Sequence, residues 1–377
     1  MSFSDYLKQF DISKFIPLIE KSTIADVKKI VDKRSIDIYD FAALLCEPAQ
    51  FFLPILAVKA RDLTIKRFGK TISFYAPLYL SNECDNVCVY CGYHNGRSIK
   101  RVTLTLEQVR IEAQKIKEIG FDSILLLTGE SPTKADVHYI KDCVKVVKDY
   151  FTYVALEVYP MSSENYQILS DAGVSGLTVY QETYDKEVYK QMHLKGAKSD
   201  YQFRIDTPER AFMGGLRKVG IGALLGLSDW KYEALHLALH IDYLRKKYWR
   251  QEVSLSFPRI NPVTSSFKIP NLVTDKDMIH LISVMRIYLD DVPFVISTRE
   301  KADFRDKLIE LAITHISAGS KTTPGGYAVK TEAQGQFDIS DKRELKEMTA
   351  IVRAKGYDPV IKDWDNNFMG VSGDYNG

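Results

Sequence analysis

The sequence has few cysteines, no long uninterrupted apolar run and almost no excess of charge of either sign. Five cysteines in 377 residues are too sparse for a disulfide framework, which small secreted domains build at much higher density. The 51 basic and 49 acidic residues leave a net charge of +2, so neither nucleic acid nor an acidic membrane is expected as an obligatory partner. The first six residues lack the basic and apolar regions of an export signal. We therefore expect a cytoplasmic location with reduced thiols.

The most apolar stretch lies between residues 41 and 58. Glu47, Pro48, Gln50 and Pro54 interrupt it, whereas a membrane-spanning helix needs about 20 predominantly apolar residues. The stretch therefore predicts two short buried helices and no membrane association. The length of the chain suits one barrel domain with extensions.

The pattern of apolar residues changes near residue 71. Residues 1–70 carry helical spacing and a helix-start signal at Thr23 and Asp26. After residue 71, short apolar runs typical of buried parallel strands alternate with longer segments typical of helices. The predicted strands are residues 72–80, 123–128, 153–158, 176–180, 221–226, 253–257, 294–298 and 314–318. The predicted helices are residues 105–119, 136–150, 163–172, 207–218, 230–248, 275–289, 301–311 and 341–355.

Eight strands that alternate with helices predict an α/β fold, specifically a (β/α)8 barrel, although a doubly wound sheet has a similar pattern. The expected organisation is a helical region at 1–70, the barrel at 71–320, and a loop and helix at 321–377 that close the barrel. In such a barrel the active site lies at the carboxyl ends of the strands. This rule selects the candidate residues below.

Three cysteines follow the first predicted strand within eight residues, as Cys84, Cys88 and Cys91 with C-x3-C-x2-C spacing. Iron–sulfur clusters are bound by cysteine thiolates, and three thiolates leave one iron of a cubane open for a reactive ligand. The same residues could instead form a structural zinc site with His94 as the fourth ligand. A chance arrangement is the remaining alternative.

The spacing of the three cysteines, and the aromatic Tyr90 before the last of them, resemble the cluster motif of the radical S-adenosylmethionine (SAM) enzymes. The resemblance implies a 4Fe–4S cluster on the three cysteines and SAM bound at the open iron. Cofactors of this kind supply the radical chemistry, and the protein supplies positioning and the exclusion of water.

Further candidates for SAM binding follow the predicted strands. Gly129 and Glu130 end the second strand, where glycine permits close approach to the backbone; a simple turn is the alternative. Glu182 ends the fourth strand, where a carboxylate can accept hydrogen bonds from ribose hydroxyls or begin a helix. Glu157 ends the third strand, at or near the barrel mouth, and is a second-rank candidate. Arg204 resembles a position that contacts the SAM carboxylate in biotin synthase-like barrels, although a solvated arginine is also possible.

Two arginines, Arg259 and Arg299, end the sixth and seventh predicted strands. Either could bind a substrate carboxylate, and either could instead pair with Glu300. We favour Arg299 because Ser297 adds a hydroxyl donor beside it. Tyr79, just before the cysteine loop, is expected to line the same pocket.

Several segments together resemble one family, the 2-iminoacetate synthases, which are the tyrosine lyases of thiamine thiazole biosynthesis. The likeness runs from about residue 20 to residue 364, and it is carried by residues 74–82, 179–184, 222–229, 256–259, 297–300 and 323–327. The resemblance implies radical cleavage of the Cα–Cβ bond of L-tyrosine. The products would be 2-iminoacetate and p-cresol, with 5′-deoxyadenosine and methionine from SAM.

Related activities remain as alternatives. A tryptophan lyase is similar, and so is a hydrogenase-maturation tyrosine lyase, whose C-terminal extension carries further cysteines; this chain has none after Cys143. An iron–sulfur or zinc scaffold without catalysis is the alternative outside the enzymes. The resemblance also implies two protein partners: a thiazole synthase that receives the product, and a flavodoxin- or ferredoxin-type electron donor.

Overall fold

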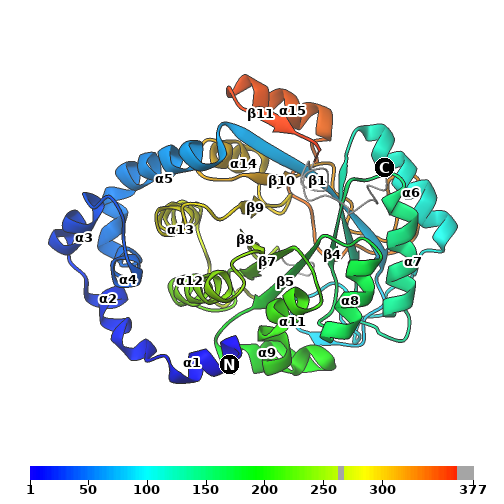
Figure 1. Ribbon diagram of the computed structural model, residues 1–377, viewed down its shortest axis with the longest axis horizontal. Coiled ribbons are helices and arrows are strands. Elements are labelled where there is room, and N and C mark those ends of the chain that lie inside the picture. The colour runs from blue at the N-terminus through cyan, green and yellow to red at the C-terminus, as the bar shows by residue number, and fades with distance from the viewer. Residues whose placement is uncertain (262–266, 363–377) are drawn as a thin grey trace, which may run out of the picture.

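The computed structural model describes residues 1–261 and 267–362, and its centre is a closed barrel of eight parallel strands (Figure 1). The barrel strands are β1 (Thr71–Ser81), β3 (Ser123–Thr128), β4 (Tyr153–Glu157), β5 (Gly176–Glu182), β7 (Lys218–Ala223), β8 (Glu252–Ser256), β9 (Phe294–Ile296) and β10 (His315–Ser317). Strand β10 pairs with β1, where His315 lies opposite Ser73. The predicted (β/α)8 barrel is therefore confirmed, and the doubly wound alternative is wrong because the first and last strands meet.

Helices cover the outside of the barrel, since the strands bury apolar side chains on both faces. These helices are α6 (Leu106–Ile119), α7 (Val137–Lys148), α8 (Ser163–Asp171), α11 (Thr207–Met213), α12 (Trp230–Lys247), α13 (Asp275–Tyr288) and α14 (Ala302–Ile309). Several boundaries differ from prediction, and two of them have a clear cause. Helix α11 ends early because Gly214 and Gly215 follow it, Gly215 with a φ of 87°. Strand β7 begins at Lys218 rather than at residue 221, since Lys218 pairs with Gly176 of β5.

The N-terminal helices form an arc outside α12 and α13 (Figure 1). They are α1 (Phe3–Gln9), α2 (Ile16–Lys21), α3 (Ile24–Val31), α4 (Ile38–Leu44) and α5 (Leu53–Phe68), with the 3-10 helices η1 (Ile12–Lys14) and η2 (Glu47–Phe52). The predicted helix start is confirmed: the side chains of Thr23 and Asp26 each accept a hydrogen bond from the other residue's backbone N–H.

No single helix in the described ranges is long and apolar enough to cross a membrane. Helix α4 and the η2–α5 segment satisfy that test only when taken together, across a bend of 84°. Phe41, Ala42, Ala43 and Leu44 of α4 are buried, as predicted. The second predicted buried helix is only half right, because one face of η2–α5 packs on α13 while Phe51, Ile55 and Val58 are exposed.

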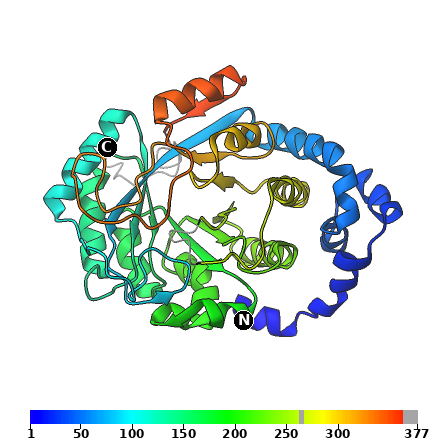
Figure 2. The ribbon, with the colours of Figure 1, turned by 180° about the vertical axis from the view of Figure 1, so that it is seen from behind.

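Two loops cross the mouth of the barrel, the end at which the parallel strands terminate (Figure 2). The cysteine loop contains β2 (Val87–Cys88), which pairs with β6 (His193–Lys195). Strand β6 belongs to an excursion after β5 that also holds α9 (Lys186–Met192), η3 (Ala197–Ser199) and α10 (Tyr201–Ile205). The second loop follows β10, and α15 (Leu345–Ala354) and β11 (Asp358–Val360) then return to the opposite end, where β11 pairs with the start of β1. The three short strands were not predicted from the sequence.

Candidate active site

The cysteine loop is tied to the ends of β1 and β3. Asn82 Nδ2 donates a hydrogen bond to the carbonyl oxygen of Lys100 (2.8 Å), and Asn82 Oδ1 accepts one from the Val102 N–H (2.7 Å). The Asp85 N–H donates to the carbonyl oxygen of Glu130 (2.8 Å). These bonds hold the loop over the mouth of the barrel.

Gly129 lies where the cysteine loop crosses the end of β3. A Cβ at this position would lie 2.2 Å from the carbonyl oxygen of Glu83 and 3.2 Å from the Cβ of Cys84. A glycine at a strand end was expected to admit a ligand; in the structure the backbone of the cysteine loop makes the close approach. Gly129 is therefore needed for the position of the first cysteine.

The three predicted metal ligands are free thiols in mainly apolar surroundings, where burial raises the pKa of Cys88 and Cys91. Cys88 is buried, and Cys84 and Cys91 are half-buried against the apolar interior of the barrel mouth. The Tyr93 N–H lies 3.4 Å from Cys91 Sγ and donates to it. In contrast, the Nδ1 atom of His94, the alternative zinc ligand, accepts a hydrogen bond from the Gly96 N–H.

The chemistry of the donor set suits an iron–sulfur cluster. Over residues 1–261 and 267–362, no three His, Cys, Asp or Glu side chains converge as ligands of one metal ion. The thiolates of a cubane bind different irons and need no such convergence. Three thiols on one loop are therefore a donor set that a 4Fe–4S cluster with one open iron can use.

A buried group of charges lies beside the cysteine loop. It brings together Glu182, Arg204 and Lys198, a residue that no sequence signal indicated. Glu182 Oε1 lies 2.6 Å from Lys198 Nζ and 3.3 Å from Arg204 Nη2. Burial by itself raises the pKa of Glu182, but the two cations outweigh burial and the pKa is lowered. Arg204 Nε also donates to the carbonyl oxygen of Tyr180 (2.7 Å).

The backbone at Glu182 is strained. Its φ of 69° is the only positive value at a non-glycine residue within the described ranges, and such conformations concentrate at functional sites. The β5–β7 register shifts at this point, and the Leu224 N–H donates to the Glu182 carbonyl oxygen (2.7 Å). The strand irregularity thus fixes the direction of the Glu182 carboxylate.

Asn86 connects the thiols to these charges. Its Oδ1 accepts a hydrogen bond from the Lys198 N–H (2.9 Å), and its Nδ2 lies 3.9 Å from Cys84 Sγ. Gly196 makes the contact possible, because a Cβ there would lie 2.1 Å from Asn86 Oδ1. The β6 excursion therefore carries Lys198 to Glu182 through a contact with the cysteine loop.

Tyr90, the aromatic residue of the cysteine motif, is held by His193. Burial lowers the pKa of His193 to about 3, so the ring is neutral. His193 Nδ1 lies 2.8 Å from the Tyr189 carbonyl oxygen and must donate to it. Its Nε2 is then an acceptor for the Tyr90 hydroxyl at 2.8 Å. The hydroxyl is engaged within the protein, and the Tyr90 ring is half-buried beside the cysteine loop.

The two candidate arginines have different surroundings. The guanidinium of Arg259 binds both carboxylate oxygens of Glu300 and also contacts Asp275 (2.8 Å). The guanidinium of Arg299 stacks 3.4 Å above the ring of Phe337 and has no ion pair or hydrogen bond with any described residue. Arg259 is thus the arginine that pairs with Glu300, and Arg299 is the one left for a ligand.

Glu157 faces the interior of the barrel, just below its mouth. Tyr153 and Ala155 of the same strand line the interior cavity, and the two-residue period of β4 directs Glu157 to the same side. Burial raises the pKa of Glu157 to about 7, against the opposing charge of Arg299. Within the part of the chain that the structure describes, its carboxylate forms no ion pair or hydrogen bond. Glu157 thus lies outside the contacts of the Glu182 group, and Arg299 is the charge that most strongly opposes the effect of burial on its pKa.

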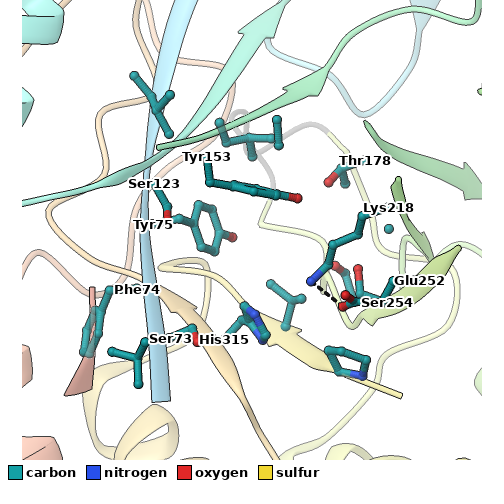
Figure 3. A pocket seen from close by; sticks show the side chains of 18 of the residues that line it. Ser73, Phe74, Tyr75, Ser123, Tyr153, Thr178, Lys218, Glu252, Ser254 and His315 are labelled. Atoms are coloured by element: carbon teal, nitrogen blue, oxygen red, sulfur yellow. Dashed lines mark ion pairs between the residues drawn. The ribbon is translucent and has the colours of Figure 1, made fainter. Parts of the chain in front are cut away.

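Below Glu157 the barrel interior is open rather than filled. A cavity of about 520 Å³ runs along the strands (Figure 3), although barrels of this type usually pack their interior with branched side chains. Small residues leave the space: Ser73, Ser123, Thr178, Gly220, Ser254 and Ser256. Tyr75, Tyr180, Leu125 and Ala155 line the end nearest the mouth, and Lys218 and Glu252 form an ion pair at the far end (2.5 Å).

The loop after β10 completes the mouth and supplies residues that the sequence did not indicate. The hydroxyl of Tyr79 donates to Gln336 Oε1 (2.8 Å), and the Gly92 N–H of the cysteine loop donates to the Gln336 carbonyl oxygen (3.2 Å). Phe337 follows and stacks on Arg299. Ser297 follows β9, and its hydroxyl accepts a hydrogen bond from the Arg299 N–H (3.4 Å). The contacts of Gln336 and Phe337 join residues far apart in sequence, so no local pattern could have revealed them.

Comparisons with known proteins agree with this geometry. Residues 78–238 match the radical SAM superfamily, and residues 256–358 match the Biotin and Thiamin Synthesis associated domain. The chain is 38% identical over 366 residues to the 2-iminoacetate synthases of Salmonella typhimurium and of Escherichia coli, covering 97% of this chain and 97% of each relative. A crystal structure of HydG, a maturase of the FeFe hydrogenase, matches with a TM-score of 0.86 and 33% identity. That match covers 94% of this chain but 79% of HydG.

Proposed function

Because the chain belongs to the 2-iminoacetate synthase family of radical SAM enzymes, we propose that the mouth of its barrel is the site at which L-tyrosine is bound and cleaved. The reaction breaks the Cα–Cβ bond of tyrosine and yields 2-iminoacetate and p-cresol, with 5′-deoxyadenosine and methionine. The cofactors are a 4Fe–4S cluster and SAM. When bound, they supply the radical that abstracts hydrogen from the substrate.

The residues proposed to hold the cofactors lie on one side of the mouth. Cys84, Cys88 and Cys91 would bind three irons. Their loop is fixed to β3 at Gly129. The neighbouring group of Glu182, Lys198 and Arg204 has donor atoms that could bind polar groups of SAM. Arg204 has an Nη1 with no hydrogen bond to a described residue, which favours binding of the SAM carboxylate. Tyr90, Glu130, Glu182 and Lys198 complete the proposed SAM site.

The substrate is proposed to occupy the other side. Arg299 would bind the tyrosine carboxylate, because its guanidinium is stacked in place on Phe337 but unpaired among the described residues; this is the observation that carries the assignment. Ser297 and Tyr79 would line the site, and Arg259 is left with a structural role. The aromatic ring would enter the upper part of the cavity between Leu125, Ala155 and the neighbouring tyrosines. A cavity of about 520 Å³ is within the range of ligand sites.

Two protein partners follow from the chemistry of the product and of the cofactor. An imine of glyoxylate hydrolyses in water, which favours transfer to a thiazole synthase over release. Reduction of the cluster needs a low-potential donor of the flavodoxin or ferredoxin type. A cytoplasmic location is proposed because an oxygen-sensitive cluster on free thiols suits a reducing compartment. The exposed Phe51, Ile55 and Val58 are candidates for a contact with a partner, whereas part of the loop after β10 is already engaged with the cysteine loop.

Product analysis after anaerobic reconstitution tests the proposal. The protein with iron, sulfide, SAM and a reductant should convert tyrosine to p-cresol and form 5′-deoxyadenosine. Tryptophan in place of tyrosine should give no indole-derived product. Indole products without p-cresol would reverse the choice of substrate, and the absence of 5′-deoxyadenosine with either amino acid would reject a radical SAM reaction. Thiazole formation that requires both this protein and the thiazole synthase would support the proposed transfer.

A further inference from the structure

We infer that Glu157 binds the amino group of the bound tyrosine and accepts one of its protons, while Arg299 holds the carboxylate; this inference rests on the function proposed above. It assigns a catalytic role to a residue that the sequence grouped with the SAM-binding candidates. The basis is the arrangement of two opposite charges, each without an ionic partner among the described residues, above the upper end of one cavity.

The first argument is the position of the two side chains. Glu157 ends β4 and Arg299 follows β9, so they approach the cavity from different parts of the barrel wall. Their charges influence each other, and both act on the same three tyrosine hydroxyls, those of Tyr75, Tyr79 and Tyr180. Yet the two side chains form no ion pair. Ala155 and Val295, which precede them on β4 and β9, both line the same cavity, so the two side chains lie above one space and do not pair across it.

The second argument is the accessibility of these groups. Glu157 and Arg299 are half-buried at the barrel mouth, directly after the cavity-lining parts of their strands, which reach Ala155 of β4 and Val295 of β9. A partly desolvated charge without a partner is costly, so two such charges beside one space favour a ligand that pairs with both. An α-amino acid zwitterion carries a carboxylate and an ammonium group on one carbon and satisfies this requirement.

The third argument is the proton count of the reaction. Tyrosine enters with three hydrogens on its nitrogen, and 2-iminoacetate leaves with one. One hydrogen leaves as an atom to the 5′-deoxyadenosyl radical, so the other must leave as a proton. In the proposed step an N–H bond breaks, nitrogen keeps the electron pair and an O–H bond forms on the Glu157 carboxylate. The p-cresol formed later takes up one proton, together with one electron from the donor, so the overall proton balance closes.

The acid–base properties of the site agree with this role. Burial raises the pKa of Glu157 to about 7, which suits a group that must accept and then release a proton near neutral pH. The charged and titratable groups that act on Glu157 come from several elements, and they are Arg299, Glu182, Lys198, Arg204, Tyr75, Tyr79 and Tyr180. Below pH 7 the carboxylate is protonated, so binding of the ammonium group and proton transfer should both weaken.

The test compares Glu157→Gln with the wild type on two ligands. Tyrosine and 3-(4-hydroxyphenyl)propanoate, which lacks only the amino group, are titrated into the reconstituted holoenzyme with SAM under anaerobic conditions. The substitution should weaken tyrosine binding by about tenfold to a hundredfold and change binding of the amine-free analogue by less than about twofold. Equal losses for both ligands would overturn the inference, as would weaker SAM binding with unchanged tyrosine binding.

Kinetics test the proton transfer separately from binding. In the wild type, kcat/KM for p-cresol formation should decrease as the pH falls below 7. This decrease, the acid limb of the pH profile, should be absent in Glu157→Gln. Activity of Glu157→Gln should instead rise with pH as free tyrosine loses its ammonium proton. The variant Glu233→Gln is the control, because burial also raises the pKa of Glu233 to about 7 but its carboxylate accepts hydrogen bonds from Thr183 and Tyr184. Its acid limb should persist.

The outcomes separate this inference from the proposed function. If the wild type makes no p-cresol from tyrosine, the proposed function fails. If the wild type makes p-cresol and Glu157→Gln retains both its rate and its acid limb, only the role of Glu157 is rejected. A pH profile of Glu157→Gln that keeps the wild-type shape, with weaker tyrosine binding, would reject the proton transfer.

Discussion

Each end of the barrel interior carries one acidic and one basic side chain. The two side chains form an ion pair at one end and do not pair at the other. At the far end, Lys218 Nζ lies 2.5 Å from Glu252 Oε1, and the two charges satisfy each other (Figure 3). At the mouth, Glu157 and Arg299 act on the same tyrosines but form no ion pair. Charge pairs that close on themselves contribute to structure, whereas opposite charges that face one space can bind a ligand carrying both signs.

The same contrast appears between the two arginines at the strand ends. Arg259 and Glu300 form a closed pair on the wall of the mouth, and Arg299 remains unpaired among the described residues. A further difference is that three connections meet at the mouth: the cysteine loop brings the thiols, the excursion after β5 brings Lys198, and the loop after β10 brings Phe337. The far end receives β11 beside β1. Chemistry is therefore expected at the mouth alone, and substitutions at the two ends should differ in kind.

The largest effect is expected at the cysteine loop. Replacing Cys88 with Ala should abolish 5′-deoxyadenosine formation, because a cubane would lose one of its three protein ligands. Iron content and the electron paramagnetic resonance signal of the reduced protein measure the cluster directly. Cys143→Ala is the matched control, since Cys143 is a buried thiol on α7, remote from the motif, and its cluster should be intact. Near-full activity in Cys88→Ala would contradict the assignment.

The next effect separates the two arginines. Arg299→Ala should raise the KM for tyrosine by about tenfold to a hundredfold, because a hydrogen bond to a charged group contributes about 1.5–3 kcal/mol. Its free energy of unfolding should change little, since the guanidinium has no ionic partner among the described residues. Steady-state kinetics and urea denaturation measure the two quantities. Normal tyrosine affinity in this variant would remove Arg299 from the substrate site.

Arg259→Ala should show the opposite behaviour. Loss of the guanidinium leaves the buried Glu300 without its partner, which is expected to cost about 3 kcal/mol in the free energy of unfolding. The KM for tyrosine should change much less than in Arg299→Ala. A lower midpoint of urea denaturation with near-normal KM is the expected result. If Arg259→Ala lost tyrosine binding while Arg299→Ala kept it, the roles of the two arginines would have to be exchanged.

Much of the fold could be predicted because its signals are local. The strands of the barrel are apolar runs between helices with clear start signals, and the cysteine motif marks the mouth directly. The ends of elements were harder: Gly214 and Gly215 stop α11, but a single sequence does not show whether a glycine ends a helix or lies within it. The three short strands were missed because each depends on a partner distant in sequence.

The sequence predicted which residues lie at the site better than it predicted which of their side chains pair with one another. Strand ends supplied Glu157, Glu182 and both arginines as candidates by one rule. Which arginine is paired depends on Glu300, which binds Arg259 rather than its neighbour Arg299, and on Phe337, which stacks on Arg299 from the loop after β10. Lys198 reaches Glu182 only through the contact of its excursion with the cysteine loop. Contacts of this kind have no period or spacing in the sequence.

A smaller effect is expected where the cysteine loop crosses β3. Gly129→Ala should push the loop away, because the new Cβ would meet the carbonyl oxygen of Glu83. Overpacking of this kind costs about 1–3 kcal/mol, and the loss should appear mainly as lower iron content and weaker SAM binding. Circular dichroism should show an intact barrel. Full iron content in Gly129→Ala would mean that the loop has room to move, and that the glycine is not needed for the cluster.

The smallest effect is expected at the far end of the cavity, from Glu252→Gln. Glu252 is partly exposed and its side chain is about two-fifths accessible (39%), so solvent screens its attraction to Lys218 and the pair should contribute at most about 1 kcal/mol. The KM for tyrosine should stay within about twofold of the wild type, since a charge that is already paired has little to offer a ligand. This variant is the counterpart of Glu157→Gln: the same chemical change, in the same cavity, at a paired instead of an unpaired carboxylate. A loss of tyrosine affinity in Glu252→Gln as large as in Glu157→Gln would show that the substrate reaches the far end. The distinction between the two ends of the barrel would then fail.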